Sequence, residues 1–214
     1  IGYTALDANT TASNNTAVGT SALGANTTGA YNIAIGNYAV DANTTANYNI
    51  GIGYNALTSS TSGASNVAIG HAALEDSNGA SNNTAIGYGS LRNNTTGTLN
   101  TAVGKDAGLA VTTGIGNSFL GGLAGDALTD ADYNVAVGSY ALTADTLGSR
   151  STAIGVSALE SQNFTSATNT YNTAVGFAAG GAITTGLYNT LIGGLAGDAL
   201  TDGSNNVALG INAL

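Results

Sequence analysis

Asn32-Ile33-Ala34-Ile35-Gly36 is the stretch that decides the fold, because close variants of it recur along the whole chain. Its glycine returns every 17 residues, apart from one interval of 21 residues. Thirteen glycines in this series bound twelve repeat units: Gly2, Gly19, Gly36, Gly53, Gly70, Gly87, Gly104, Gly121, Gly138, Gly155, Gly176, Gly193 and Gly210. A repeat of this length predicts a solenoid, in which each unit buries its apolar side by stacking on its neighbours.

The composition argues against two classes of partner, nucleic acids and membranes. The chain has 3 basic and 12 acidic residues and a net charge of −9. Nucleic acids and anionic membrane surfaces both attract basic residues, so we expect neither as a partner. The apolar runs are much shorter than the roughly 20 residues that span a bilayer, so we expect no membrane insertion by this segment. Because the repeat starts and stops in mid-pattern, we interpret residues 1–214 as a single solenoid segment of a longer fibre protein.

Equivalent residues of the repeat share a physical role when each unit is numbered from its glycine as position 0. Position 3 is small, position 4 is usually Leu or Val, and position 16 is always a branched aliphatic residue. We assign all three positions to the interior, and their β-branched residues favour strands. The sequence therefore predicts an all-β fold, a parallel β-solenoid of twelve 17-residue coils. We expect two short strands in each coil, at positions 13 to 1 and 3 to 9.

Two polar positions are nearly constant. Position 8 is Thr in ten of twelve units, and position 13 is Asn in all units except the one with Ser151. In a stack with a spacing of about 4.8 Å, identical amides or hydroxyls lie above one another and hydrogen-bond along the axis. We predict a structural Asn ladder of Asn15, Asn32, Asn49, Asn66, Asn83, Asn100, Asn117, Asn134, Asn172, Asn189 and Asn206. We predict that the position 0 glycines from Gly19 to Gly210 form corners of the coil.

Two departures from the pattern carry information. Four units have Gly at position 4 and an apolar residue at position 7: Gly108 with Val111, Gly125 with Leu128, Gly180 with Ile183, and Gly197 with Leu200. We interpret this exchange as refilling of a shared interior of limited volume.

The longer unit has a four-residue insertion within residues 161–171. We expect this insertion to lengthen a turn that projects sideways, with Phe164 near its tip.

The sequence also predicts self-association. Each coil offers few aliphatic side chains to offset the conformational entropy of its ordered residues. The alanine columns at positions 3 and 15 form a second apolar strip, which a single chain would leave facing water. Small residues suit the close approach of another backbone, so we expect a homo-oligomer that associates along the rod.

Residues 65–74 read S-N-V-A-I-G-H-A-A-L and residues 83–91 read N-T-A-I-G-Y-G-S-L, which resembles the head repeats of trimeric autotransporter adhesins. Similar repeats occur in bacteriophage tail fibres. The resemblance covers essentially the whole chain, although the coil here is longer than is usual in the adhesin family. It implies a left-handed parallel β-roll, three chains around a threefold axis, and display at a bacterial surface for binding to host matrix.

Residues with catalytic or ligand-binding chemistry are sparse. Asp126, Asp130 and Asp132 lie close together in sequence, but the calcium-binding β-roll motif Gly-Gly-x-Gly-x-Asp is missing. We interpret these carboxylates as solvated turn residues, and predict no metal site and no cofactor. His71 is the only histidine, and no cysteine or buried acid pair accompanies it, so the sequence predicts no catalytic residue and no enzyme.

Tyrosine is concentrated at position 12. Exposed tyrosines there can stack on sugars and hydrogen-bond a partner, or they can cover a strand edge and pack against a sister chain. The candidate partner-binding residues are Tyr31, Tyr48, Tyr133, Tyr171, Tyr188 and Phe164.

These observations favour a structural fibre or adhesin segment that forms a rod of about 60 Å. We expect an extracellular rod, on a cell surface or virion, that binds a host receptor, matrix protein or glycan along its side. The alternative is an ice-binding solenoid, because regular Thr columns on a flat face can match a crystal lattice. Adjacent threonines at positions 8 and 9 point to opposite faces of a strand, however, which halves such an array.

Overall fold

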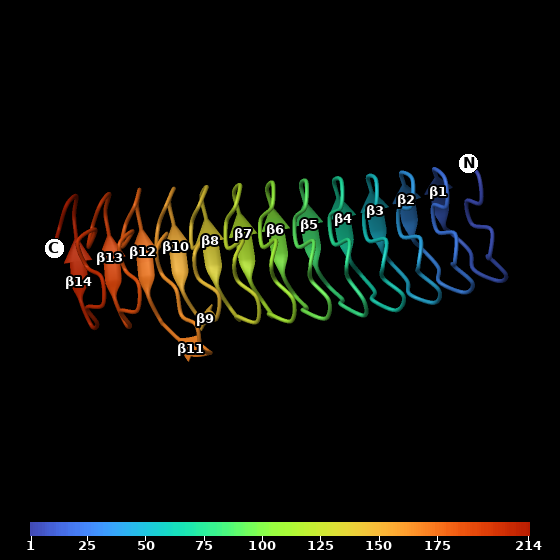
Figure 1. Cartoon of the computed structure of the whole chain (residues 1–214). Helices are drawn as coiled ribbons and strands as arrows, with labels where there is room; N and C mark the ends of the chain where they lie inside the picture. The colour runs from blue at the N-terminus through green and yellow to red at the C-terminus, as the bar shows by residue number, and fades with distance from the viewer.

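The computed structural model describes residues 1–214 and has the shape of one elongated rod coiled around a single axis (Figure 1). It is an all-β parallel solenoid without helices, as the sequence predicts. Each coil adds one three-residue strand to a parallel sheet of 12 strands. In sheet order these are β1 (Thr16–Val18), β2 (Ile33–Ile35), β3 (Ile50–Ile52), β4 (Val67–Ile69), β5 (Thr84–Ile86), β6 (Thr101–Val103), β7 (Ser118–Leu120), β8 (Val135–Val137), β10 (Thr152–Ile154), β12 (Thr173–Val175), β13 (Thr190–Ile192) and β14 (Val207–Leu209).

Equivalent positions of successive repeats lie directly above one another in this sheet. Ile35 pairs with Ile52, and Ile52 pairs with Ile69. The register continues across the longer unit, where Ala153 of β10 pairs with Ala174 of β12. The predicted stacking of coils is therefore confirmed. Eleven steps of about 4.8 Å place the first and last strands about 53 Å apart.

The rest of each coil is a tight turn segment, so the prediction of a second strand at positions 3 to 9 is wrong. Residues at positions 2 and 4 have positive φ angles, such as 54° at Ser21 and 52° at Leu23. Such angles belong to the left-handed region and prevent an extended strand. The turn segments of adjacent coils still bond to each other, for example through Leu23 N–H and Ala39 O at 3.0 Å. Their backbone groups are therefore paired without strand geometry.

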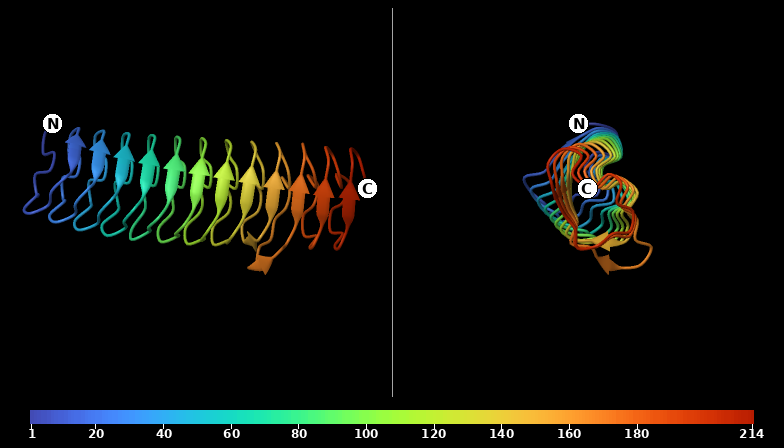
Figure 2. Two further views of the ribbon diagram at one scale, coloured as in Figure 1. Left: turned by 180° about the vertical axis from the view of Figure 1, so that it is seen from behind. Right: turned by 90° about the vertical axis from the view of Figure 1, so that its left-hand side faces the viewer.

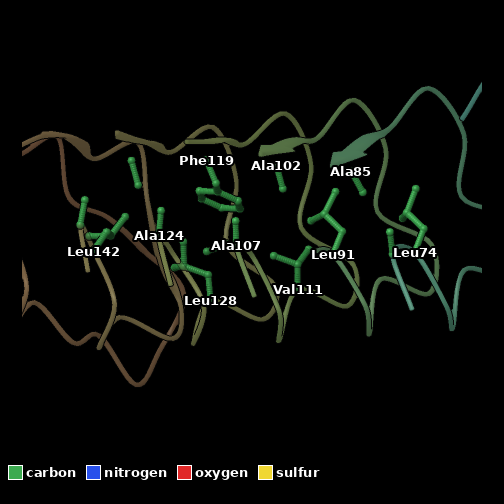
Figure 3. Packing of buried hydrophobic residues seen from close by; sticks show 14 of the residues in the cluster. Leu74, Ala85, Leu91, Ala102, Ala107, Val111, Phe119, Ala124, Leu128 and Leu142 are labelled. Atoms are coloured by element: carbon green, nitrogen blue, oxygen red, sulfur yellow. The ribbon is translucent and has the colours of Figure 1, made fainter. Parts of the chain in front are cut away.

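The interior is lined by positions 3, 4 and 15. Leucines of the turn segments, such as Leu74 and Leu91, face strand alanines such as Ala85 and Ala102 (Figure 3). All four side chains are fully buried. The prediction that positions 3 and 4 face inward is confirmed.

The predicted orientation of position 16 is wrong. Ile35 is 40% exposed, whereas Ala34 beside it is fully buried. Because successive side chains of a strand point to opposite faces, a buried residue at position 15 forces positions 14 and 16 outward. The alanine strip at positions 3 and 15, expected to face water in a single chain, is instead part of the core at both positions. The coil is so narrow that ten of the twelve strands contribute only alanine or glycine to the interior.

Two strands carry a large residue at position 15, and this explains the glycines at position 4. A Cβ atom added at Gly108 or Gly125 would lie 2.7 Å or 2.5 Å from ring carbons of Phe119. Leu191 has the same relation to Gly180 and Gly197. Val111 and Leu128 are fully buried in the same interior (Figure 3), so the prediction that positions 4 and 7 share one core is confirmed. Phe119 and Leu191 are therefore the residues that require the glycines, a role that was not predicted from the sequence.

The longer unit projects sideways between β10 and β12 (Figures 1 and 2). Within the projection, β11 (Thr168–Asn169) pairs in parallel with β9 (Gly148–Ser149) of the preceding coil. Phe164 does not lie at an exposed tip as predicted, because it is only 7% exposed and its N–H donates to the buried Asp145 Oδ1 at 3.0 Å. Residues 165–167 form the exposed part of the loop instead.

Candidate functional site

Each strand of the large sheet turns two side chains outward, one on either side of its buried middle residue. We call these twenty-four side chains, two from each of 12 strands, the outer sheet face. At position 14 they are Thr16, Ile33, Ile50, Val67, Thr84, Thr101, Ser118, Val135, Thr152, Thr173, Thr190 and Val207. At position 16 they are Val18, Ile35, Ile52, Ile69, Ile86, Val103, Leu120, Val137, Ile154, Val175, Ile192 and Leu209. None of these residues is charged.

The outer sheet face is flat, regular and mostly apolar. Position 16 forms an unbroken aliphatic column in which Ile35 and Ile192 are each 40% exposed and Leu120 is 52% exposed. Two residues along a strand span about 6.6 Å and twelve strands span about 58 Å, so these two columns cover about 380 Å². Contiguous exposed patches of a few hundred square ångströms that are mostly apolar are often interaction sites. This face is therefore the strongest candidate for an interface.

The Asn column at position 13 holds this face in register. Asn32 is fully buried, and its Oδ1 accepts the N–H of Asn49 in the next coil at 2.9 Å. Its Nδ2 donates to Ala46 O at 2.9 Å. Each such side chain thus joins its own coil to the start of the next strand. Ser151 interrupts the column beside the insertion, where its Oγ bonds to Thr170 Oγ1 at 2.6 Å.

The glycine column at position 0 allows adjacent coils to approach closely at the end of each strand. Gly36 has a φ of +136°, which L-residues rarely adopt. A Cβ atom there would lie 2.4 Å from Gly53 O in the next coil. Both the backbone angle and the contact distance therefore require glycine at this corner.

The Thr column at position 8 uses its hydroxyls within the protein. Thr27 Oγ1 donates to Thr44 O at 3.0 Å, and Thr95 Oγ1 donates to Thr112 O at 3.0 Å. Hydroxyls that already donate to the neighbouring coil are poorly placed to order an external lattice. This geometry gives no support to the ice-binding alternative, which stays an untested prediction.

The predicted tyrosines at position 12 are all exposed, but they stack on their neighbours. The rings of Tyr31 and Tyr48 are 5.2 Å apart and nearly parallel, and those of Tyr171 and Tyr188 are 5.9 Å apart. The Arg150 guanidinium carbon lies 5.3 Å from the ring centre of Tyr133. A neighbour along the rod axis covers at least one face of each ring, so ring edges and hydroxyls make up most of what remains for a partner. The geometry thus favours hydrogen bonding over stacking on a sugar, and the buried Phe164 does not belong to this surface.

A second aromatic row surrounds the only histidine. His71 stacks between Tyr54 and Tyr88, with ring centres 5.3 Å and 5.1 Å away. Tyr38 meets Tyr54 edge-on at 5.9 Å. All of these rings come from the coil corners just after the strands.

The acidic residues considered as metal ligands do not converge. Asp126 accepts from Thr143 Oγ1, Asp130 from Thr113 Oγ1, and Asp132 from Ile115 N–H at 2.7 Å. No group of three Asp, Glu, His or Cys residues is placed to hold a metal ion. Burial raises the pKa of the Asp126 carboxyl, and the hydrogen bond from Thr143 opposes this shift.

Two of the three basic residues are paired with carboxylates. Arg92 Nε lies 2.6 Å from Glu75 Oε2, and Lys105 Nζ lies 3.3 Å from Asp106 Oδ2. The surface has no pocket. No helix of the structure has the length and the apolar run that crossing a bilayer requires.

Comparisons with models of protein families, with curated proteins and with solved structures return no match to this chain.

Proposed function

We propose that this chain is a structural segment of an extracellular fibre, in which copies of the chain lie side by side along their outer sheet faces. The observation that carries the proposal is the uncharged, exposed aliphatic face that runs the length of the rod. Burial of apolar surface is the main driving force for association of this kind. An elongated body with such a face suits a filament that holds other elements away from a surface.

A second copy of the chain is the partner that best fits this face. Its columns repeat at the same spacing, so two parallel copies can pack coil against coil along their whole length. The acidic residues that give the chain a net charge of −9 all lie outside the outer sheet face. Copies therefore meet with least electrostatic repulsion where their uncharged faces come together.

We further propose an assembly of three chains on a cell surface or virion, as in the adhesins and tail fibres whose repeats this sequence resembles. In that assembly the outer sheet faces meet near a common axis. The edges and hydroxyls of the tyrosine column, with Tyr31, Tyr48 and Tyr188, are then the candidate contacts for a host receptor, matrix protein or glycan.

The first test is the mass of the purified chain in solution, measured by light scattering. The proposal predicts three times the 20.7 kDa of one chain. A mass of 20.7 kDa at all accessible concentrations would exclude self-association through this face. A dimer would retain the face as an interface and reject the number three.

Charged substitutions then identify the face. Ile35→Lys, Ile86→Lys and Ile154→Lys together place three charges on the outer sheet face, where they would be buried without partners in the oligomer. The matched control is Thr28→Lys, Asn93→Lys and Ser161→Lys, which adds the same charge at exposed positions outside the face. We expect the first variant to be monomeric and the control to keep the oligomer mass. Circular dichroism of both variants verifies that the β-structure is retained.

A further inference from the structure

The side chains at position 7 point into the coil and form a second polar column. Asn43 Nδ2 donates to Asn26 Oδ1 of the preceding coil at 2.8 Å and to Ala46 O of its own coil at 3.1 Å. Asn26 Nδ2 donates in the same way to Gly29 O at 2.9 Å. In these coils the amide satisfies both the neighbouring side chain and a turn carbonyl.

Two successive coils replace this asparagine by serine. Ser60 and Ser77 are both fully buried, and neither hydroxyl has a hydrogen-bond partner among the groups of the protein. Asn43 Oδ1 in the preceding coil and Asn94 Oδ1 in the following coil are also buried without a partner. Four consecutive coils of one column therefore each contain an unpaired polar atom.

The turn carbonyls of the same coils are short of a donor as well. Ala46 O accepts from both Asn32 Nδ2 and Asn43 Nδ2, at 2.9 Å and 3.1 Å. Gly63 O and Ala80 O, at the equivalent position, accept from the position 13 amide alone, at 2.7 Å and 2.8 Å. The second amide donor is missing at each serine.

We propose that the interior of these two coils binds water, one molecule at Ser60 and one at Ser77, in place of the two missing amides. Each serine has two heavy atoms fewer than asparagine, which leaves space beside its hydroxyl. At Ser60 the available partners are the hydroxyl itself, Asn43 Oδ1 and Gly63 O, and three partners are typical of a buried water. Unpaired buried polar groups are costly, so water that completes these bonds is retained.

The chemistry of this column favours water over other ligands. No carboxylate lies among the four unpaired atoms to balance a cation, and the structure has no pocket that would admit a larger molecule. In the two coils that follow Asn94, the same column contains Val111 and Leu128, whose buried apolar side chains need no water. Position 7 thus accepts either a polar or an apolar side chain. Among the residues found there, serine is the only one that is both small and polar.

The test is a high-resolution crystal structure of the wild type and of the double variant Ser60→Asn and Ser77→Asn. The wild type should show a density peak within hydrogen-bond distance of each serine Oγ, and the peak at Ser60 should also contact Asn43 Oδ1. In the variant, both peaks should be replaced by amides that continue the column. Absence of the wild-type peaks, or peaks with the short coordination distances of a metal ion, would overturn the proposal.

Thermal unfolding at one fixed protein concentration gives a second readout. Ser60→Ala with Ser77→Ala removes the hydroxyls that hold the water and leaves Asn43 Oδ1 and the carbonyls without it, so we expect Tm to fall by about 2–4 °C. The asparagine variant should keep or raise Tm, and the exposed control Ser62→Asn should leave it unchanged. An unchanged Tm in the alanine variant would contradict the bound water.

Discussion

Asn66 and Asn83 are joined twice across adjacent coils, because Asn66 Oδ1 accepts the backbone N–H of Asn83 at 3.0 Å and its side-chain amide at 3.3 Å. Asn66 Nδ2 also donates to Ala80 O at 2.8 Å. One buried side chain therefore satisfies two backbone groups of the next coil, the Asn83 N–H and the Ala80 carbonyl. The same arrangement, repeated along the column, fixes where each strand of the outer sheet face begins.

Asn66→Ala should be strongly destabilising. The substitution leaves the buried Asn83 N–H without its acceptor and removes the only donor to Ala80 O, and each unpaired buried group costs about 1–3 kcal/mol. We expect the free energy of unfolding in urea to fall by about 2–4 kcal/mol. Asn93→Ala, at an exposed turn position without a positive φ, is the control and should change it little. Equal effects of the two substitutions would show that the column carries no special stability.

Alanine substitutions should destabilise the protein at glycines packed against the next coil, but not at glycines with open space around Cα. Gly36→Ala brings Cβ within 2.4 Å of Gly53 O and forces alanine to a φ of +136°. We expect a loss of at least about 3 kcal/mol in unfolding free energy, because strain and a backbone clash act together. Gly194→Ala is the control, since its added Cβ meets no atom within 4 Å. If both variants unfold at the wild-type urea concentration, the corner geometry described above is wrong.

Phe119 and Gly108 should be coupled in a double-mutant cycle. Phe119→Ala leaves a cavity in the core and should cost about 3–5 kcal/mol. Gly108→Ala places Cβ 2.7 Å from the Phe119 ring and should cost about 1–3 kcal/mol in the wild type. In the Phe119→Ala background the clash with the ring is gone, whereas the contact with Leu91 Cδ2 at 2.9 Å and the φ of +61° remain, so the cost should become smaller without vanishing. Additive effects, measured by urea unfolding, would contradict the shared interior.

Asp145 should make stability depend on pH. Burial raises the pKa of this carboxyl above its ordinary value of 3.8, and hydrogen bonds from Phe164 N–H and the Gln162 amide oppose the shift. A carboxyl with a raised folded-state pKa binds its proton more tightly in the folded protein, so stability declines as the pH rises through that pKa. Asp145→Asn lacks this ionisation. Relative to the wild type, it should therefore gain stability as the pH rises from about 4 to about 7.

Urea unfolding at several pH values measures this difference. Asp76→Asn, at an exposed position, corrects for the general effect of removing one negative charge. A stability difference between Asp145→Asn and wild type that stays constant with pH would show that the Asp145 carboxyl does not titrate differently in the folded state.

Much of the fold follows from the repeat itself. The 17-residue spacing of residues such as Ile35 and Ile52 predicts their stacking, because one coil must return the chain to the same place. The inward leucines, such as Leu74, also follow from their position in the repeat. Positive φ angles at residues such as Leu23 have no such signal, because leucine rarely adopts them. The sequence therefore predicts a strand where the structure has a turn segment.

The candidate interface was harder to predict because a three-residue strand has two faces and the apolar pattern does not say which is buried. Their size predicts a core position for large aliphatic residues such as Ile86, but the narrow coil admits only Ala85 beside it. A usable signal was present in Phe119, because the only large residues at position 15 occur where glycine occupies position 4 of both the same unit and the next one. That exchange marks position 15 as inward, and hence position 16 as outward.

The central claim, association through the outer sheet face, is tested most directly by cross-linking, since the chain has no cysteine of its own. Ile86→Cys places a thiol in the middle of this face, where the native side chain is 37% exposed, and Asn93→Cys places one on the exposed turn segment of the next coil. Under mild oxidation we predict that Ile86→Cys yields disulfide-linked pairs of chains, while Asn93→Cys stays largely unlinked. Cross-linking of Ile86→Cys that is no faster than that of Asn93→Cys would contradict the claim.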